Sequence, residues 1–96
     1  MTDERDDPAR IPLEDAFDLH SFLPGDIHSA LDEYLREARS AGFAEVRIIH
    51  GKGTGAARAH VRQILSAHPG VIRYGDAPPE RGGMGATIVR IRPVED

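Results

Sequence analysis

The sequence predicts a two-layer α/β domain in which a four-stranded mixed sheet carries both helices on one face. Short apolar stretches of strand length alternate with two segments of helical periodicity, in the order βαβαββ. The chain has 96 residues and no cysteine, so we expect one domain whose core needs no disulfide. Two right-handed crossovers that advance in the same direction place both helices on the same face of the sheet.

The first strand and the first helix are expected between residues 17 and 42. FDLH at 17–20 alternates apolar and polar residues, so Phe17 and Leu19 are expected to face the core. The helix begins near Pro24, which suits a first helical turn, and it ends before Gly42. Its apolar residues recur at helical spacing, at Ile27, Leu31, Tyr34, Leu35 and Ala38.

The second half of the chain supplies the other helix and three strands. VRII at 46–49 is the second strand, and a glycine-rich loop separates it from a helix that ends at His68-Pro69-Gly70. The last two strands are VIRYG at 71–75 and ATIVRIR at 86–92. We expect the strand order 1-2-4-3, with the last strand antiparallel and central. The buried stripe of the second helix comprises Ala57, Val61, Ile64 and Leu65.

Residues 1–15 differ in composition from the rest of the chain. They are rich in acidic residues and lack periodicity, so we expect a disordered acidic arm in front of a domain that spans 16–96. The sequence shows no leader-like segment and no run of about 18 apolar residues. These features predict a cytoplasmic protein without membrane contact.

The net charge of −4 hides a polarity along the chain. Residues 1–16 and residues 17–46 each carry a net charge of −4, whereas residues 47–92 carry eight bases against two acids, a net charge of +6. A basic half is the electrostatic feature expected for an anionic partner such as nucleic acid. The alternative is ordinary solvated surface charge.

The stretch HGKGTG at 50–55 places three glycines between a strand and a helix. Glycine lets backbone approach a ligand closely, and backbone N–H groups ahead of a helix N-terminus suit a phosphate. If the first two strands are neighbours, His20 and His50 lie at the same end of the sheet, next to Lys52. The alternative is a tight structural turn, and the spacing matches neither the Walker loop nor the dinucleotide fingerprint.

Three motifs in order, FDLHS at 17–21, IIHGKGTG at 48–55 and GGMGATIVRI at 82–91, resemble the Smr (small MutS-related) family over residues 17–92. The resemblance implies a fold similar to the C-terminal domain of bacterial translation initiation factor three. It also implies nucleic-acid binding, with nicking or endonuclease activity on DNA or RNA. Some members act on messenger RNA at stalled ribosomes, which makes the ribosome a further expected partner.

By position, Asp18, Leu19 and His20 match the DLH motif of that family, and residues 50–53 match its HGKG motif. Ser21 stands where the family usually has glycine, and Ala57 stands where a larger apolar residue is common. Phosphate contacts are expected from the loop and from four arginines, namely Gly51, Lys52, Gly53, Thr54, Gly55, Arg58, Arg62, Arg90 and Arg92.

Two chemistries are compatible with the candidate catalytic residues. RNA could be cleaved without a metal or other cofactor, with His20 and His50 as the acid/base pair, Asp18 as the orienting group and Lys52 as the phosphate clamp. DNA lacks the 2′-hydroxyl, so its cleavage would need an activated water and a divalent ion held by Asp18 with a histidine. We prefer the metal-independent route, since no dense carboxylate cluster or other metal-ligand motif is present.

Two further hypotheses do not involve catalysis. The domain could bind nucleic acid or a ribosome through the same loop, or it could be an adaptor without a nucleic-acid role, which the basic half disfavours. Three histidines, His28, His60 and His68, are expected on helix surfaces and are given no function. Phe22, beside the DLH motif, is a weaker candidate for stacking on a base.

Overall fold

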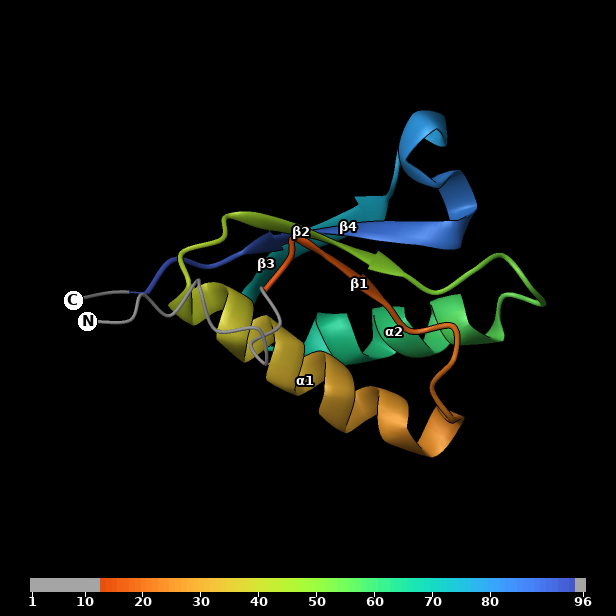
Figure 1. Ribbon diagram of the computed structural model, residues 1–96, viewed down its shortest axis with the longest axis horizontal. Helices are drawn as coiled ribbons and strands as arrows, with labels where there is room; N and C mark the ends of the chain where they lie inside the picture. The colour runs from red at the N-terminus through yellow and green to blue at the C-terminus, as the bar shows by residue number, and fades with distance from the viewer. Residues whose placement is uncertain (1–12, 95–96) are drawn as a thin grey trace, which may run out of the picture.

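The structure is a computed structural model that describes residues 13–94, and its elements follow the predicted order (Figure 1). The predicted arm therefore lies outside the described residues except for residues 13–15, which contact the domain. The elements are β1 (Ala16–Asp18), α1 (Pro24–Ser40), β2 (Glu45–Ile49), α2 (Ala56–Ala67), β3 (Val71–Asp76), the short 3₁₀ helices η2 (Pro79–Arg81) and η3 (Gly83–Gly85), and β4 (Ala86–Ile91).

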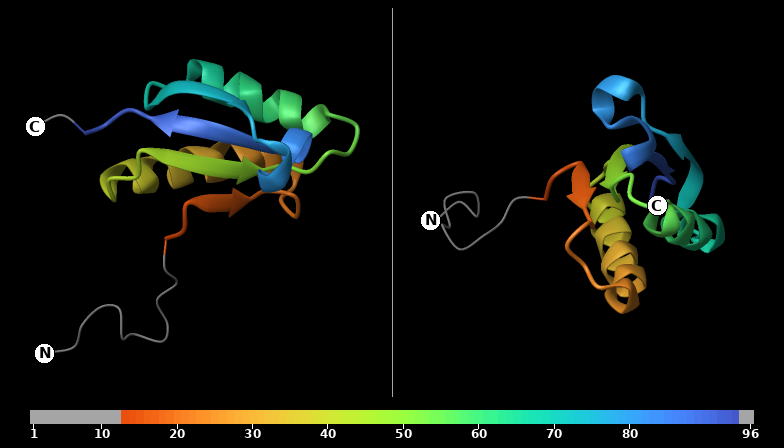
Figure 2. Two further views of the ribbon diagram at one scale, coloured as in Figure 1. Left: turned by 90° about the horizontal axis from the view of Figure 1, so that it is seen from above. Right: turned by 90° about the vertical axis from the view of Figure 1, so that its right-hand side faces the viewer.

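The four strands form one mixed sheet in the order β1-β2-β4-β3, which confirms the predicted topology. β1 and β2 are parallel, and β4 pairs antiparallel with both β2 and β3. Both helices cover the same face of this sheet, and β1 lies at one edge (Figures 1 and 2). The predicted likeness to translation initiation factor three stays a prediction.

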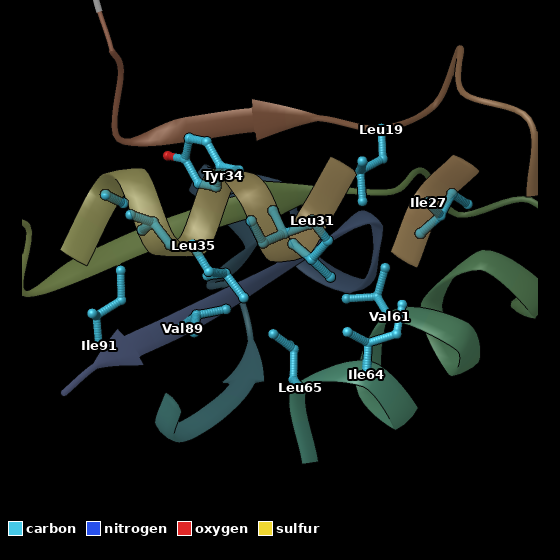
Figure 3. Packing of buried hydrophobic residues seen from close by; sticks show 13 residues of the cluster. Leu19, Ile27, Leu31, Tyr34, Leu35, Val61, Ile64, Leu65, Val89 and Ile91 are labelled. Carbon is cyan, nitrogen blue, oxygen red and sulfur yellow. The ribbon is translucent and has the colours of Figure 1, made fainter. Parts of the chain in front are cut away.

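The core lies between the inner face of the sheet and the two helices (Figure 3). Leu31 of α1 and Val61 of α2 are fully buried, and they pack with Val46, Ile48 and Val89 from the two central strands. The strand residues alternate, as one-sided burial requires, so Glu45, Arg47 and Arg90 emerge on the other face. The helical periodicity of the sequence thus identified the buried face of α1 and, apart from Ala57, that of α2. Ala57 is only partly buried because it lines the loop cavity at the start of the helix.

Tyr34 attaches the segment before β1 to α1. Its ring stacks on Phe17 with centroids 4.5 Å apart, and its hydroxyl donates a hydrogen bond of 2.6 Å to the carbonyl oxygen of Glu14. Burial, with a smaller contribution from the charges of Asp15 and Glu14, raises the pKa of Tyr34 to about 12. The phenol therefore stays neutral and continues to donate throughout the physiological range.

Each strand differs from its predicted bounds by one or two residues, and β1 and β4 both end earlier than predicted. β1 ends at Asp18 rather than His20, because the Asp18 carboxylate accepts the backbone N–H of His20 and turns the chain out of the sheet. β4 ends at Ile91 rather than Arg92, although the Arg92 N–H still bonds the Gly70 carbonyl oxygen. Within residues 13–94 no helix has both the length and the apolar character needed to cross a bilayer.

Candidate functional site

The ends of β1 and β2 and the start of β4 meet at one end of the sheet. The Leu19 N–H donates to the carbonyl oxygen of Ile49 over 2.8 Å, which keeps the DLH segment beside the end of β2. The carbonyl oxygen of Gly85, just before β4, accepts the N–H groups of both His50 (3.0 Å) and Gly51 (2.9 Å). The three segments that carry the sequence motifs are therefore joined by backbone hydrogen bonds.

His50 lies inside this junction, and its side chain is held on both sides. The residue is 5% exposed, and its Nδ1 lies 2.9 Å from the carbonyl oxygen of Gly51. A carbonyl oxygen only accepts, so Nδ1 is the donor to Gly51, and Nε2 is left to accept the Thr87 hydroxyl at 2.9 Å. Both ring nitrogens are thus used to hold the glycine loop against β4.

His20 is exposed, and Asp18 orients it. One carboxylate oxygen of Asp18 accepts both the backbone N–H of His20 (2.9 Å) and its ring Nδ1–H (2.5 Å). These two bonds, the backbone bond first, lower the pKa of Asp18 below its ordinary value. Because Nδ1 is held as a donor, Nε2 is the ring atom that can exchange a proton.

The glycine loop adopts backbone conformations that other residues rarely reach. Gly51, Gly53 and Gly55 have φ angles of +80°, +41° and +89°, and the Gly55 N–H closes a turn onto the carbonyl oxygen of Lys52 at 3.2 Å. Gly55 is also the N-cap residue of α2, and it supplies no side-chain cap. With no acidic residue in its first turn, α2 presents an uncompensated positive end of its dipole beside Lys52.

A cavity of about 420 Å³, here called the loop cavity, lies between the β1–α1 turn and this loop. Lys52 is exposed there, and the small side chains of Ala56 and Ala57 line its α2 side. The full lining is Leu19, His20, Phe22, Pro24, Ile27, His50, Gly51, Lys52, Gly53, Thr54, Gly55, Ala56, Ala57 and His60. The predicted DLH and HGKG residues other than Asp18 all contribute to it.

His60 is a lining residue that the sequence reasoning missed. The sequence predicts it as a helix-surface residue without a function, yet it lines the loop cavity from the second turn of α2. Its position four residues after Ala56, the first residue of α2, places both on the helix side that adjoins the glycine loop. This spacing could have identified it.

Arg58 and Arg62, predicted as phosphate contacts, are engaged within the protein. Both donate to one carboxylate oxygen of Asp76 at the end of β3, with Nη2–Oδ1 distances of 2.7 Å and 2.6 Å. These bonds, that of Arg58 first, lower the pKa of Asp76. The Arg62 guanidinium also lies 5.4 Å from the ring centre of Tyr74. Neither arginine lines the loop cavity.

Arg90 and Arg92 lie away from the loop cavity, because β4 starts at the cavity and runs away from it. Arg90 is paired across the sheet with Glu45 and Arg73, near the other end of the strand. Arg92 lies beyond the end of β4, about 20 Å along an extended chain from Ala86, and its Nε donates to the Pro69 carbonyl oxygen. The structure therefore does not bring these two arginines to the predicted phosphate site.

The donors around the cavity suit an anion better than a tightly held metal ion. Within residues 13–94, no three histidine or acidic side chains gather in a group that could hold a metal. The nearest carboxylate, that of Asp18, already accepts two hydrogen bonds from His20 through one oxygen. Imidazole, ammonium and backbone N–H groups are the kinds of donor that bind and protonate a phosphodiester.

The comparisons with known proteins identify relatives of the whole described domain. The Smr domain family model matches residues 17–92. The endonuclease MutS2 of Thermus thermophilus is 41% identical over 76 residues, and that of Halalkalibacterium halodurans is 47% identical over 62 residues. The first match covers 79% of this chain and 10% of the relative, so the chain spans about a tenth of the length of these proteins.

Two solved structures share the fold. The Smr domain of Thermus thermophilus MutS2 superimposes with a TM-score of 0.78 at 40% identity, covering 81% of this chain and 98% of that domain. YdaL, a stand-alone small MutS-related protein from Escherichia coli, also gives a TM-score of 0.78, at 27% identity, covering 88% of this chain and 69% of YdaL.

The Asp18 carboxyl group is expected to titrate below its ordinary pKa of 3.8 in the folded protein. A lowered pKa means that the Asp18–His20 contacts stabilise the fold above pH 3.8 and that this contribution is lost as the pH falls through the lowered value. Carboxyl-carbon NMR measures the midpoint. In His20→Ala the backbone bond persists, so the pKa should rise only part of the way. A wild-type midpoint at or above 3.8 would contradict the paired geometry.

Thr87→Val is expected to loosen the junction between β2 and β4. Valine has the shape of threonine but no hydroxyl, so the buried Nε2 of His50 loses its donor, at a cost of about 1–3 kcal/mol in the free energy of unfolding. Urea denaturation measures the change. The control is Ser21→Ala in the exposed turn after β1, which removes a hydroxyl from the surface and should change stability by less than about 0.5 kcal/mol. Equal effects at the two positions would refute the role assigned to Thr87.

Proposed function

The chain belongs to the Smr domain family, and on that premise we propose that it binds the sugar–phosphate backbone of nucleic acid in the loop cavity and cleaves it there. The observation that carries the proposal is the meeting of Lys52, the glycine loop and the Asp18-oriented His20 around one cavity. The name of the MutS2 relatives, endonuclease, agrees with this reaction type.

The anion-binding part of the proposal depends on three positive features at one place. Lys52 is exposed, and the loop glycines allow the backbone to approach a ligand. The first turn of α2 has no acidic residue, Gly55 supplies no side-chain cap, and the Thr54 hydroxyl accepts only the Ala56 N–H, at 3.4 Å. A phosphate accepts hydrogen bonds from such N–H groups while Lys52 neutralises part of its charge. We place one phosphate of the substrate here.

The proton-transfer part of the proposal assigns Nε2 of His20 as the atom that exchanges protons. With RNA, the 2′-oxygen attacks the phosphorus, the bond to the 5′-oxygen breaks, and a 2′,3′-cyclic phosphate and a 5′-hydroxyl result. One imidazole takes the 2′-hydroxyl proton and a second gives a proton to the departing 5′-oxygen. Lys52 stabilises the extra negative charge on the phosphate oxygens.

His60 is our candidate for the second imidazole. The sequence predicted His50 in this role, and that role stays a prediction. Since both ring nitrogens of His50 bond within the protein, the geometry favours His50 as the residue that positions the loop. His60 lines the same cavity as His20 and comes from α2, on the opposite side from the DLH segment.

A second candidate function is a binding module without catalysis. The engagement of His50 within the junction favours it, because it leaves His20 as the exposed imidazole of the two predicted from the motifs. Such a module would recognise a phosphate backbone, in free nucleic acid or in a ribosome, with the same cavity. Cleavage of DNA with a divalent ion near Asp18 is a third outcome for the same experiment.

Cleavage of end-labelled single-stranded RNA in EDTA is expected from the wild-type protein, with cyclic phosphate ends. His20→Ala and His60→Ala should each lower the rate by about 10²–10⁴-fold, the usual contribution of a general acid or base. The matched control is His28→Ala, because His28 lies on α1 outside the loop cavity.

Each other result of this assay has a defined meaning. Unchanged rates in His20→Ala would overturn the catalytic assignment. Loss of activity in His20→Ala but not in His60→Ala would refute only the assignment of His60 as the second imidazole. Cleavage only with added divalent ions would indicate a metal-dependent reaction with the ion near Asp18. Salt-sensitive binding without any cleavage would support the binding module.

Lys52 is expected to contact phosphate directly, and it is the only lysine of the sequence. Lys52→Ala should weaken RNA binding and reduce the slope of log affinity against log salt by about 1, because one phosphate contact is lost. Arg92→Ala, at the far end of β4, should leave the slope within error. Bound RNA should also protect the Lys52 amine from an acylating reagent. Equal slopes for Lys52→Ala and the wild type would exclude the contact.

A further inference from the structure

We propose that the edge of the sheet at β1 binds a cationic, apolar peptide segment of a partner protein. The site is a groove of about 580 Å³ between β1 and α1, here called the acidic groove, which shares only Phe22 with the loop cavity. Its floor consists of Phe17, Phe22 and Tyr34, and its rim carries Glu14, Glu33 and Glu37. The proposal does not depend on the proposed function. It concerns the acidic first half of the chain, whereas the loop cavity adjoins the basic second half.

The aromatic floor provides the apolar contact. Phe17 lies between the other two rings, stacked on Tyr34 at 4.5 Å and edge-on to Phe22 at 5.7 Å. Phe22 is 38% exposed, which is high for a phenylalanine that already touches a core residue. An apolar side chain placed on this cluster would bury ring surface that now faces water.

The acidic rim selects the charge of the ligand. Glu33 and Glu37 are one turn apart on α1, and like charges at this spacing repel each other. Within residues 13–94, none of the three rim glutamates takes part in an ion pair. A lysine or arginine of a ligand would relieve the repulsion and pair with the rim.

The position of β1 favours an extended peptide. Within residues 13–94, β1 is an edge strand that pairs only with β2, so its outer side is available to a further strand. Side chains alternate along a strand, so a peptide with alternating apolar and basic residues would place one set on the floor and the other at the rim. Figure 2 shows β1 at the border of the sheet, beside α1.

Charge also decides among possible occupants. The rim carboxylates repel phosphate, which disfavours a nucleic-acid backbone in the groove, although Phe22 also lines the loop cavity and is a weaker candidate for stacking on a base. Residues 1–12 of the chain carry four acids against two arginines, which does not complement an acidic rim. A basic segment of another protein complements it.

The test uses a synthetic hexapeptide of alternating leucine and arginine, and a control peptide with glutamate in place of arginine. Titration followed by two-dimensional NMR should shift resonances of β1 and α1 with the first peptide and none with the second. Glu37→Lys should weaken binding at least tenfold. Glu80→Lys on η2 changes the net charge equally but lies outside the groove, so it should have less than a twofold effect.

Several results would overturn the proposal. Equal weakening by Glu37→Lys and Glu80→Lys would show non-specific attraction to an acidic protein. Shifts confined to residues that do not line the acidic groove would place the binding elsewhere. Concentration-dependent shifts of the groove residues in the protein alone would show that a second copy of the chain occupies the groove instead of a foreign peptide.

Discussion

The candidate site depends on one polar junction, in which the start of β4 holds the end of β2. The Gly85 carbonyl oxygen accepts two successive N–H groups, and the Thr87 hydroxyl donates to the ring of His50. Backbone that turns through left-handed conformations has no ladder of its own, so it needs such external partners. The positions of Lys52, the loop glycines and the first turn of α2 all follow from this junction.

The junction also explains why three separated motifs act together. The DLH segment is bound to the end of β2, the HGKG segment follows β2, and the GGMGATIV segment supplies Gly85 and Thr87. A Cβ atom on Gly85 would lie 3.4 Å from Cγ of Lys52, so the third motif packs directly against the second. Residues whose side chains never reach a ligand thereby set the shape of the cavity.

The sequence was sufficient for the fold because the fold depends on local periodicity and on handedness. The spacing of Leu31 and Leu35 predicted the buried face of α1, and the length and apolar content of the last strand predicted its central place in the sheet. The partners of individual polar groups required the three-dimensional register. His50 meets Thr87 only because β2 pairs with β4, and Arg58 and Arg62 meet Asp76 only because α2 packs on β3. Charge counting alone could not separate these structural arginines from ligand-binding ones.

The N-terminus of α2, where Gly55 supplies no side-chain cap, links the stability of the domain to the binding of the proposed phosphate ligand. A side-chain cap at a helix N-terminus contributes about 1 kcal/mol, and Gly55 supplies none. The Thr54 hydroxyl accepts only the Ala56 N–H, at 3.4 Å, so under the proposed function a phosphate that accepts the other N–H groups of this turn would complete the cap. A ligand that binds only the folded state stabilises that state by mass action. Phosphate binding and the free energy of unfolding are then linked. A stronger side-chain cap would weaken phosphate binding and would raise the free energy of unfolding of the free protein.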